Sequence, residues 1–167
     1  MAYRTESWIN CSIRLGRTRS PNTKGPARNS QCLNTTRQSL WSLPRSGLVE
    51  PYVSPAILAE VHDVMGRPSI RTKFRQLTDD VVAEFIERIE RIAIRVDEVG
   101  TGITLVRDPK DEPHLNLAAE CQADYLVSRD RDLLKGADTI ARTMPHLRIV
   151  EPAAFLIAVR RQIGNTF

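Results

Sequence analysis

The sequence predicts an α/β domain with a parallel sheet and helices on both of its faces. Two observations lead to this prediction. From about residue 39 onward, short apolar runs alternate with longer segments in which apolar residues recur at helical spacing. Two of the short runs, 124–128 and 147–150, are compact and continuous, which is typical of strands buried on both faces of a parallel sheet. A length of 167 residues is enough for one domain with a substantial core.

Each expected element has a local signal. The expected strands are the short apolar runs 48–54, 94–106 (one or two short strands around Gly100 and Gly102), 124–128 and 147–150. The expected helices follow a capping residue, a proline or both, over 55–65 after Ser54, 79–94 after Thr78, 112–121 after Asp111 and 152–161 from Pro152. The segment 79–94 also has an apolar face, because Val81, Phe85, Ile89 and Ile92 recur at helical spacing. The order of these elements predicts a parallel sheet with crossover helices.

The N-terminal segment differs from the rest of the chain. Residues 1–47 carry eight basic residues and one acid, so the segment is +7, whereas the other 120 residues sum to −3. Residues 1–38 are also rich in Ser, Asn, Thr and Arg and lack a sustained apolar period. We therefore expect an irregular basic segment over 1–38, disordered or out of frame, and a folded domain over 39–167. The net charge of +4 is then weak evidence for nucleic-acid binding by the domain itself.

Several classes of protein are disfavoured. No apolar run approaches the roughly 20 residues of a membrane-spanning helix, and the N-terminus does not resemble a secretory signal. Three cysteines cannot all pair, which favours a reducing, cytoplasmic location. A glycine-rich phosphate loop, a Gly-x-Ser-x-Gly elbow and a His-Glu-x-x-His motif are absent from the sequence. His62, His114 and His146 lack metal-ligand spacing, so each is expected to be a surface or structural residue.

Carboxylates occur at the ends of the predicted elements. Asp130 follows the strand 124–128, with Asp132 two residues later, and Asp111 begins the preceding helix. Glu60 lies in the helix after the first clear strand. Taken singly, Asp111 is explained as an N-cap and Glu60 as a solvated helix residue. If they converge at one sheet edge, their mutual repulsion calls for a cation, and such oxygen ligands suit Mg²⁺ or Mn²⁺. Phosphodiester hydrolysis uses clusters of this kind.

Three segments together resemble the PIN-domain family, in particular its branch of toxin components of bacterial toxin–antitoxin systems. They are SPAILAEVHDVMGRPSI, VRDPKDEPHLNLAAECQADYLVSRDRDLL and LRIVEPAAFL, and the resemblance extends over about residues 39–160. It implies a Rossmann-like nuclease fold, an acidic site that holds Mg²⁺ or Mn²⁺, cleavage of RNA, and an antitoxin protein as partner. The implied metal ligands are Glu60, Asp111 and Asp130, which are also the catalytic residues, with Asp132 as a frequent additional ligand.

The resemblance also bears on substrate and partners. Ser128 matches the family's hydroxyl residue, which would orient water or phosphate. Arg129 and Arg131 are expected either to contact the RNA backbone or to be ordinary solvated charges. The resemblance is also compatible with a homodimer.

The chain departs from the family at its beginning. The family opens with an apolar strand that ends in Asp-Thr-Asn and whose Asp is a metal ligand, but this sequence contains no Asp before Asp63. A shifted reading frame upstream of about Ser39 would explain both the missing Asp and the change in composition, and the coding DNA would test it. The first-strand Asp is therefore expected to be missing, with the strand itself missing or altered. This leaves an alternative function, namely a catalytically degenerate PIN fold that acts as a binding scaffold or is an inactive gene product.

Overall fold

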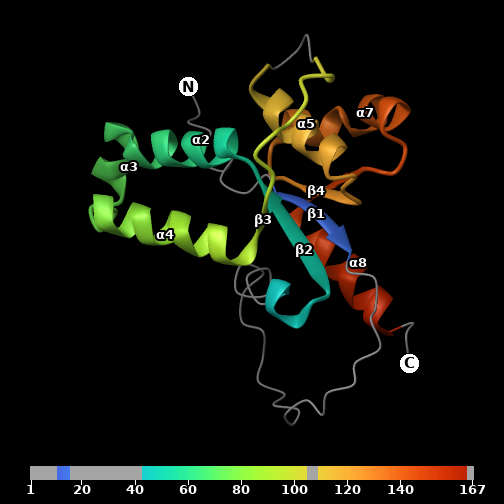
Figure 1. Ribbon diagram of the computed structural model, residues 1–167, viewed down its shortest axis with the longest axis horizontal. Coiled ribbons are helices and arrows are strands. Elements are labelled where there is room, and N and C mark those ends of the chain that lie inside the picture. The colour runs from blue at the N-terminus through green and yellow to red at the C-terminus, as the bar shows by residue number, and fades with distance from the viewer. Residues whose placement is uncertain (1–10, 16–42, 105–108, 165–167) are drawn as a thin grey trace.

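The computed structural model describes residues 11–15, 43–104 and 109–164 (Figure 1). The strands are β1 (Cys11–Leu15), β2 (Val49–Val53), β3 (Ile94–Arg95), β4 (Tyr125–Val127) and β5 (Arg148–Val150). The α-helices are α2 (Pro55–Gly66), α3 (Pro68–Lys73), α4 (Asp79–Ile92), α5 (Glu112–Glu120), α6 (Arg131–Lys135), α7 (Ala137–Thr143) and α8 (Pro152–Gly164). Two 3₁₀ turns, η1 (Pro44–Ser46) and η2 (Pro109–Asp111), precede β2 and α5. Of the described helices, none combines the length and apolarity needed to cross a membrane.

The sheet confirms the α/β class, but it is mixed rather than wholly parallel. Its strand order is β3-β2-β1-β4-β5. β2 pairs in parallel with β3, and β4 pairs in parallel with β5, whereas β1 is antiparallel to both β2 and β4. The strands β2 to β5 therefore share one direction, and the central strand alone runs the opposite way. A strand is therefore present near the N-terminus, at the centre of the sheet and antiparallel to both of its neighbours.

The prediction of an irregular segment before residue 39 is wrong for residues 11–15, which form the centre of the sheet. The local signal of this strand is short, because its polar and apolar residues alternate, as is typical of a strand, over only five residues. Pairing far along the chain specifies it, since Ser12 lies opposite Leu126. At its end the Leu15 N–H donates to Asp124 Oδ2 over 2.8 Å. Residues 1–10 and 16–38 lie outside the described residues, so the boundary at residue 39 stays a prediction.

Two apolar cores lie on opposite faces of the sheet, as predicted from the alternation of helices and strands. One core joins α2, α5, α6 and α7 to the sheet through residues such as Leu58, Leu115 and Leu126. The other joins α8 to the opposite face through Phe155 and Val159. There the rings of Tyr125 and Phe155 meet edge to face, with centroids 5.3 Å apart. In Figure 1, α5 accordingly lies above the strands, and α8 lies below and partly behind them.

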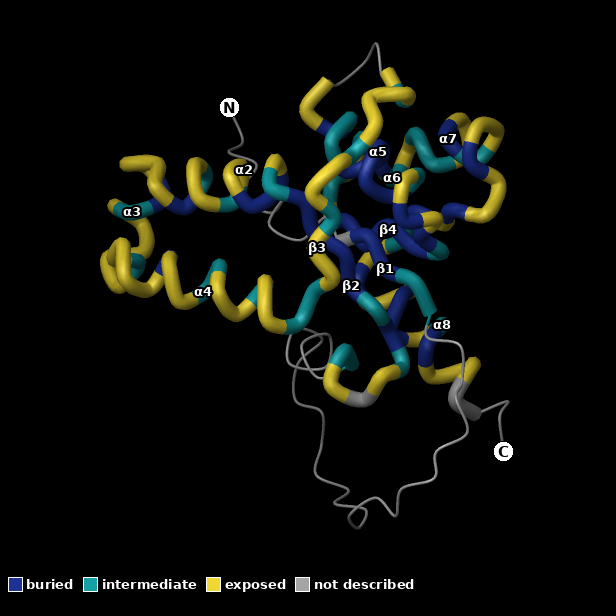
Figure 2. Tube along the Cα trace, in the orientation of Figure 1, coloured by how far each residue is buried: buried dark blue, intermediate teal, exposed yellow. Residues whose placement is uncertain are grey.

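Helices α2, α3 and α4 form an arm that extends away from the sheet (Figures 1 and 2). The arm begins as predicted, because the Ser54 hydroxyl caps α2 by accepting from the Ile57 N–H. Thr78 caps α4 in the same way, through the N–H of Val81. Most of α4 is exposed, and Val82 is its one buried residue. Helix α3, like the short helices α6 and α7, is an addition that the sequence pattern did not predict.

Candidate active site

Asp130 lies at the carboxyl end of β4, where it begins α6 as its N-cap. Its Oδ1 accepts hydrogen bonds from the Asp132 N–H at 2.7 Å and from the Leu133 N–H at 3.4 Å. The Asp130 N–H in turn donates to Ser128 Oγ at 2.9 Å. The side chains of Ser128 and Asp130 therefore hold the tight turn between β4 and α6, and Asp132 is half-buried in the first turn of α6.

Ser128 is fully buried in this turn, with no accessible surface. Its hydroxyl therefore supports the backbone of Asp130 in this structure. Arg129 and Arg131, on either side of Asp130, are exposed to solvent. Two exposed guanidinium groups beside a half-buried carboxylate are compatible with contacts to a phosphate backbone, and equally with a solvated surface.

Asp111 is the last residue of η2 and lies at the N-cap position of α5, as predicted, although its side chain makes no capping hydrogen bond. The residue is buried, with 9% of its surface exposed. His114 follows one turn later on the same helix and is also buried. Residues three positions apart share a helix face, so Asp111 and His114 lie on the same side of α5.

Glu60 contacts His114 across the gap between α2 and α5. Its Oε2 lies 3.3 Å from His114 Nε2, and its side chain is 43% exposed. The hydrogen bond from His114 lowers the pKa of the Glu60 carboxyl, against the opposing effect of partial burial. The positive charges of Arg67 and Lys110 lower this pKa further. The surroundings of Glu60 are therefore cationic.

His114 is the principal residue that the sequence reasoning missed at this site. It was expected to be a surface or structural residue, since it has no metal-ligand spacing to the other histidines. Its spacing of three residues from Asp111, on a helix with a buried face, is the signal that could have drawn attention to it. Its partner Glu60 could not have been inferred, because the two residues are 54 positions apart.

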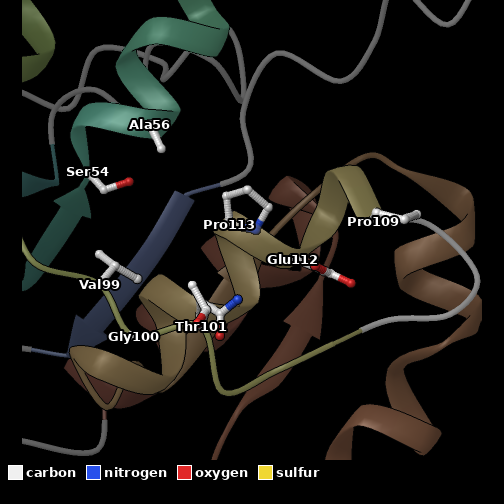
Figure 3. Close-up of a pocket in the computed structure, with 9 residues that line it drawn as sticks. Ser54, Ala56, Val99, Gly100, Thr101, Pro109, Glu112 and Pro113 are labelled. Carbon is white, nitrogen blue, oxygen red and sulfur yellow. The ribbon is translucent and has the colours of Figure 1, made fainter.

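A small pocket of about 250 Å³ opens between the starts of α2 and α5 (Figure 3). It is lined by Ser54 and Ala56 of α2, Glu112, Pro113 and Asn116 of α5, Pro109, and the loop residues Val99, Gly100 and Thr101. Asn116 holds that loop against α5. Its Oδ1 accepts from the Ile103 N–H at 2.8 Å, and its Nδ2 donates to the Ile103 carbonyl at 3.1 Å. The sequence reasoning did not identify Asn116, whose role depends on this distant loop.

The three predicted metal ligands lie on three different elements, namely α2, η2 and the start of α6. Glu60, Asp111 and Asp130 supply the oxygen ligands that a hard divalent ion prefers. However, within the described residues, no group of three His, Cys, Asp or Glu side chains lies close enough to hold a metal ion. Glu60 contacts His114, and the Asp130 carboxylate caps α6.

The fold and site define the class of protein: an α/β domain with carboxylates at the starts of the helices that precede and follow its strand β4. The family model described as "PIN domain" matches residues 27–132, more than half of the chain, so the chain belongs to the PIN-domain family. This family is of nuclease type and generally uses divalent metals. The comparisons found no matching curated protein and no matching solved structure.

Proposed function

We propose that this domain is a metal-dependent endoribonuclease of the toxin–antitoxin type, which hydrolyses RNA phosphodiester bonds, and that this chain does so weakly. The observation that supports the proposal most directly is the position of Asp130 in a PIN-family chain. It follows β4 at the carboxyl end of four co-directional strands, which is where α/β sheets bind their ligands.

In this proposal Glu60, Asp111 and Asp130 are the catalytic acids and hold Mg²⁺ or Mn²⁺, with Asp132 as an additional ligand. Ser128 contributes to substrate binding through the turn that carries Asp130, because its hydroxyl accepts the Asp130 N–H. Arg129 and Arg131, both exposed, contact the RNA phosphates.

The proposal extends to the setting of the enzyme. A cognate antitoxin protein would neutralise it, and its location would be the reducing cytoplasm. A homodimer remains an open element of the proposal.

The weak activity follows from the central strand. The resemblance implies a ligand Asp on the family's first strand, whereas this chain has no Asp before Asp63, and its strand β1 contains no acid. A site with three carboxylates in place of four attracts a divalent ion less strongly. Phosphodiester cleavage also depends on exact placement, and an error of about 1 Å can cost about 100-fold in rate. The RNase activity of this chain is therefore expected to be very low.

The alternative function is a catalytically degenerate PIN fold that serves as a binding scaffold or is an inactive gene product. It is favoured by the absence of a three-ligand group among the residues that the structure describes. The two functions differ in a measurable way, because only the nuclease should bind Mn²⁺ through Asp130.

The test combines Mn²⁺ titration of the full chain by calorimetry with an RNA-cleavage assay. Weak Mn²⁺ binding and feeble cleavage are expected, and both should be lost in Asp130→Asn. Asp138→Asn is the matched control, because Asp138 is an exposed acid on the next helix, α7, and is not one of the proposed ligands. If Asp130→Asn and Asp138→Asn behave alike, the scaffold is the better assignment. Strong cleavage by the unaltered chain, lost in Asp130→Asn, would show that the expected weakness is wrong.

A restored chain provides a second test. Replacing residues 1–38 by a segment with an apolar strand that ends in Asp-Thr-Asn should raise RNase activity by orders of magnitude. Asp130→Asn in the restored chain should abolish that gain. An unchanged activity would contradict the role given to the missing Asp.

A further inference from the structure

Glu60 and His114 form a pair that joins a proposed metal ligand to a buried side chain on another helix. Glu60 lies on α2 and His114 on α5, and their side-chain atoms Oε2 and Nε2 are 3.3 Å apart. Glu60 is largely open to solvent on its other side, while the His114 side chain is buried, since 9% of it is exposed. The contact thus joins the partly exposed Glu60 side chain to the buried His114 side chain.

The hydrogen-bonding state of the imidazole follows from its burial. His114 Nδ1 is buried and has no hydrogen-bond partner among the described residues. A buried N–H without a partner costs more than a buried lone pair without one, because a strong donor is then left unsatisfied. The tautomer with its hydrogen on Nε2 avoids that cost and directs the N–H at Glu60. The His114 ring is therefore a donor toward the carboxylate.

Further positive charges near Glu60 also oppose the binding of a cation there. Besides His114, two positive residues attract the carboxylate electrostatically. They are Arg67, which directly follows α2, and Lys110 in η2. A cation in solution would have to compete with these groups. In the part of the chain that the structure describes, Glu60 does not belong to a group of three His, Cys, Asp or Glu side chains that could hold a metal ion.

We infer that His114, rather than a metal ion, is the resident partner of Glu60 in this chain, and that the contact ties α2 to α5 and must open before Glu60 can bind a divalent cation. His114 is then a positioning residue that competes with the metal. The metal part of this inference depends on the proposed function, whereas the tie between the helices does not. The tie gives Glu60 a partner, His114, other than the metal ion that the family resemblance implies.

The first test is metal-free and examines the tie. The melting temperatures of the wild-type chain, Glu60→Gln, His114→Leu and the double variant are compared as a double-mutant cycle. Leucine has a volume close to that of histidine and no N–H in its side chain, so it removes the donor while filling the site. Glu60→Gln should lower the melting temperature of the wild type, and the decrease should be about half as large or smaller when His114→Leu is already present. Additive effects would overturn the tie.

The second test adds Mn²⁺ and examines the competition. Calorimetric titration of His114→Leu should show Mn²⁺ binding about tenfold tighter than that of the wild type, because a hydrogen bond to a charged group no longer holds Glu60. His114→Gln retains an N–H donor and should bind Mn²⁺ as weakly as the wild type. His146→Leu is the control, since His146 is exposed and precedes β5. A role limited to stability would not tighten metal binding.

The outcomes separate this inference from the proposed function. Equal or weaker Mn²⁺ affinity in His114→Leu overturns the competition. No Mn²⁺ binding by any variant, together with a non-additive cycle, supports the tie and overturns the proposed metal site. If His114→Leu does not fold, ¹⁵N NMR of the wild-type imidazole decides the tie, because a hydrogen on Nδ1 rather than on Nε2 would overturn it.

Discussion

Helices α4 and α5 differ sharply in burial. Helix α5 has five buried residues among its nine, whereas α4 has one buried residue among fourteen (Figure 2). The difference arises from position: α5 packs on β1 and β4 at the centre of the sheet, while α4 packs in the arm against α2 and β2. An apolar stripe thus indicates which side of a helix faces the protein, but the neighbouring elements determine how deeply that side is buried.

The two regions also differ in what stabilises them. The α5 region is held by side chains such as Leu115 and Leu117, which have no accessible surface. The arm instead carries exposed ion pairs, among them Arg67–Asp63 at 2.7 Å and Arg91–Glu87 at 3.2 Å. Exposed pairs of this kind typically contribute about 0.2–1 kcal/mol each to the free energy of unfolding. Substitutions in the two regions should therefore differ greatly in effect.

The largest expected effect is at Leu115. Leu115→Ala should lower the free energy of unfolding by about 2–5 kcal/mol, because it removes a fully buried side chain and leaves a cavity. Val81→Ala, on α4, should change it by about 0.5 kcal/mol or less, since Val81 is 42% exposed. Urea unfolding measures both. Similar losses at the two positions would mean that a partner or an undescribed segment covers α4 in solution.

A second effect is expected at alkaline pH. Burial raises the pKa of the Cys121 thiol, at the end of α5, from 9.0 to about 11. The unfolded chain then loses this proton at lower pH than the folded chain does. The stabilising contribution is complete below about pH 9 and is lost as the pH rises to about 11, with a loss of about 1 kcal/mol at pH 10.

The alkaline effect can be isolated by substitution. Burial also raises the pKa of Tyr52, which adds to the loss at still higher pH. Unfolding by urea at pH 8 and pH 10 should therefore be compared between the wild type and Cys121→Ala, in which the Tyr52 contribution remains. The decrease in stability between the two pH values should be smaller in the variant. An equal decrease would indicate that the thiol is not shielded from water.

A further pair of effects concerns the helix caps. Asp130 caps α6 with a hydrogen bond of 2.7 Å, while Thr78 caps α4 through a bond of 3.4 Å. Removing an N-cap side chain typically costs about 0.5–2 kcal/mol. Asp130→Ala should therefore fall in the upper half of that range and Thr78→Ala in the lower half, as measured by thermal unfolding. The reverse order would imply that the carboxylate of Asp130 is under strain that its removal relieves.

Local signals in the sequence predicted much of the fold. Ser54 followed by Pro55 predicts the start of α2 because the capping hydroxyl and the fixed proline φ act within one turn. The run around Tyr125 predicts β4, and the position of Asp130 after it follows directly. The Asp111 start of α5 was likewise predicted, although the side chain makes no capping bond. These features depend on residues that are close in the sequence, so they can be predicted from it.

Other features depend on residues far apart in the chain. The strand β1 exists because β2 and β4 pair with it on both sides, and its direction follows from that pairing rather than from its five residues. The Glu60–His114 contact likewise arises where α2 and α5 meet. Thus the sequence by itself determined the class of fold, the starts of α2, α4, α5 and α8 and the acids at the element ends, because these result from short-range capping and periodicity. Only the tertiary structure decided the reversed central strand and the partner of Glu60, because long-range pairing and packing set both.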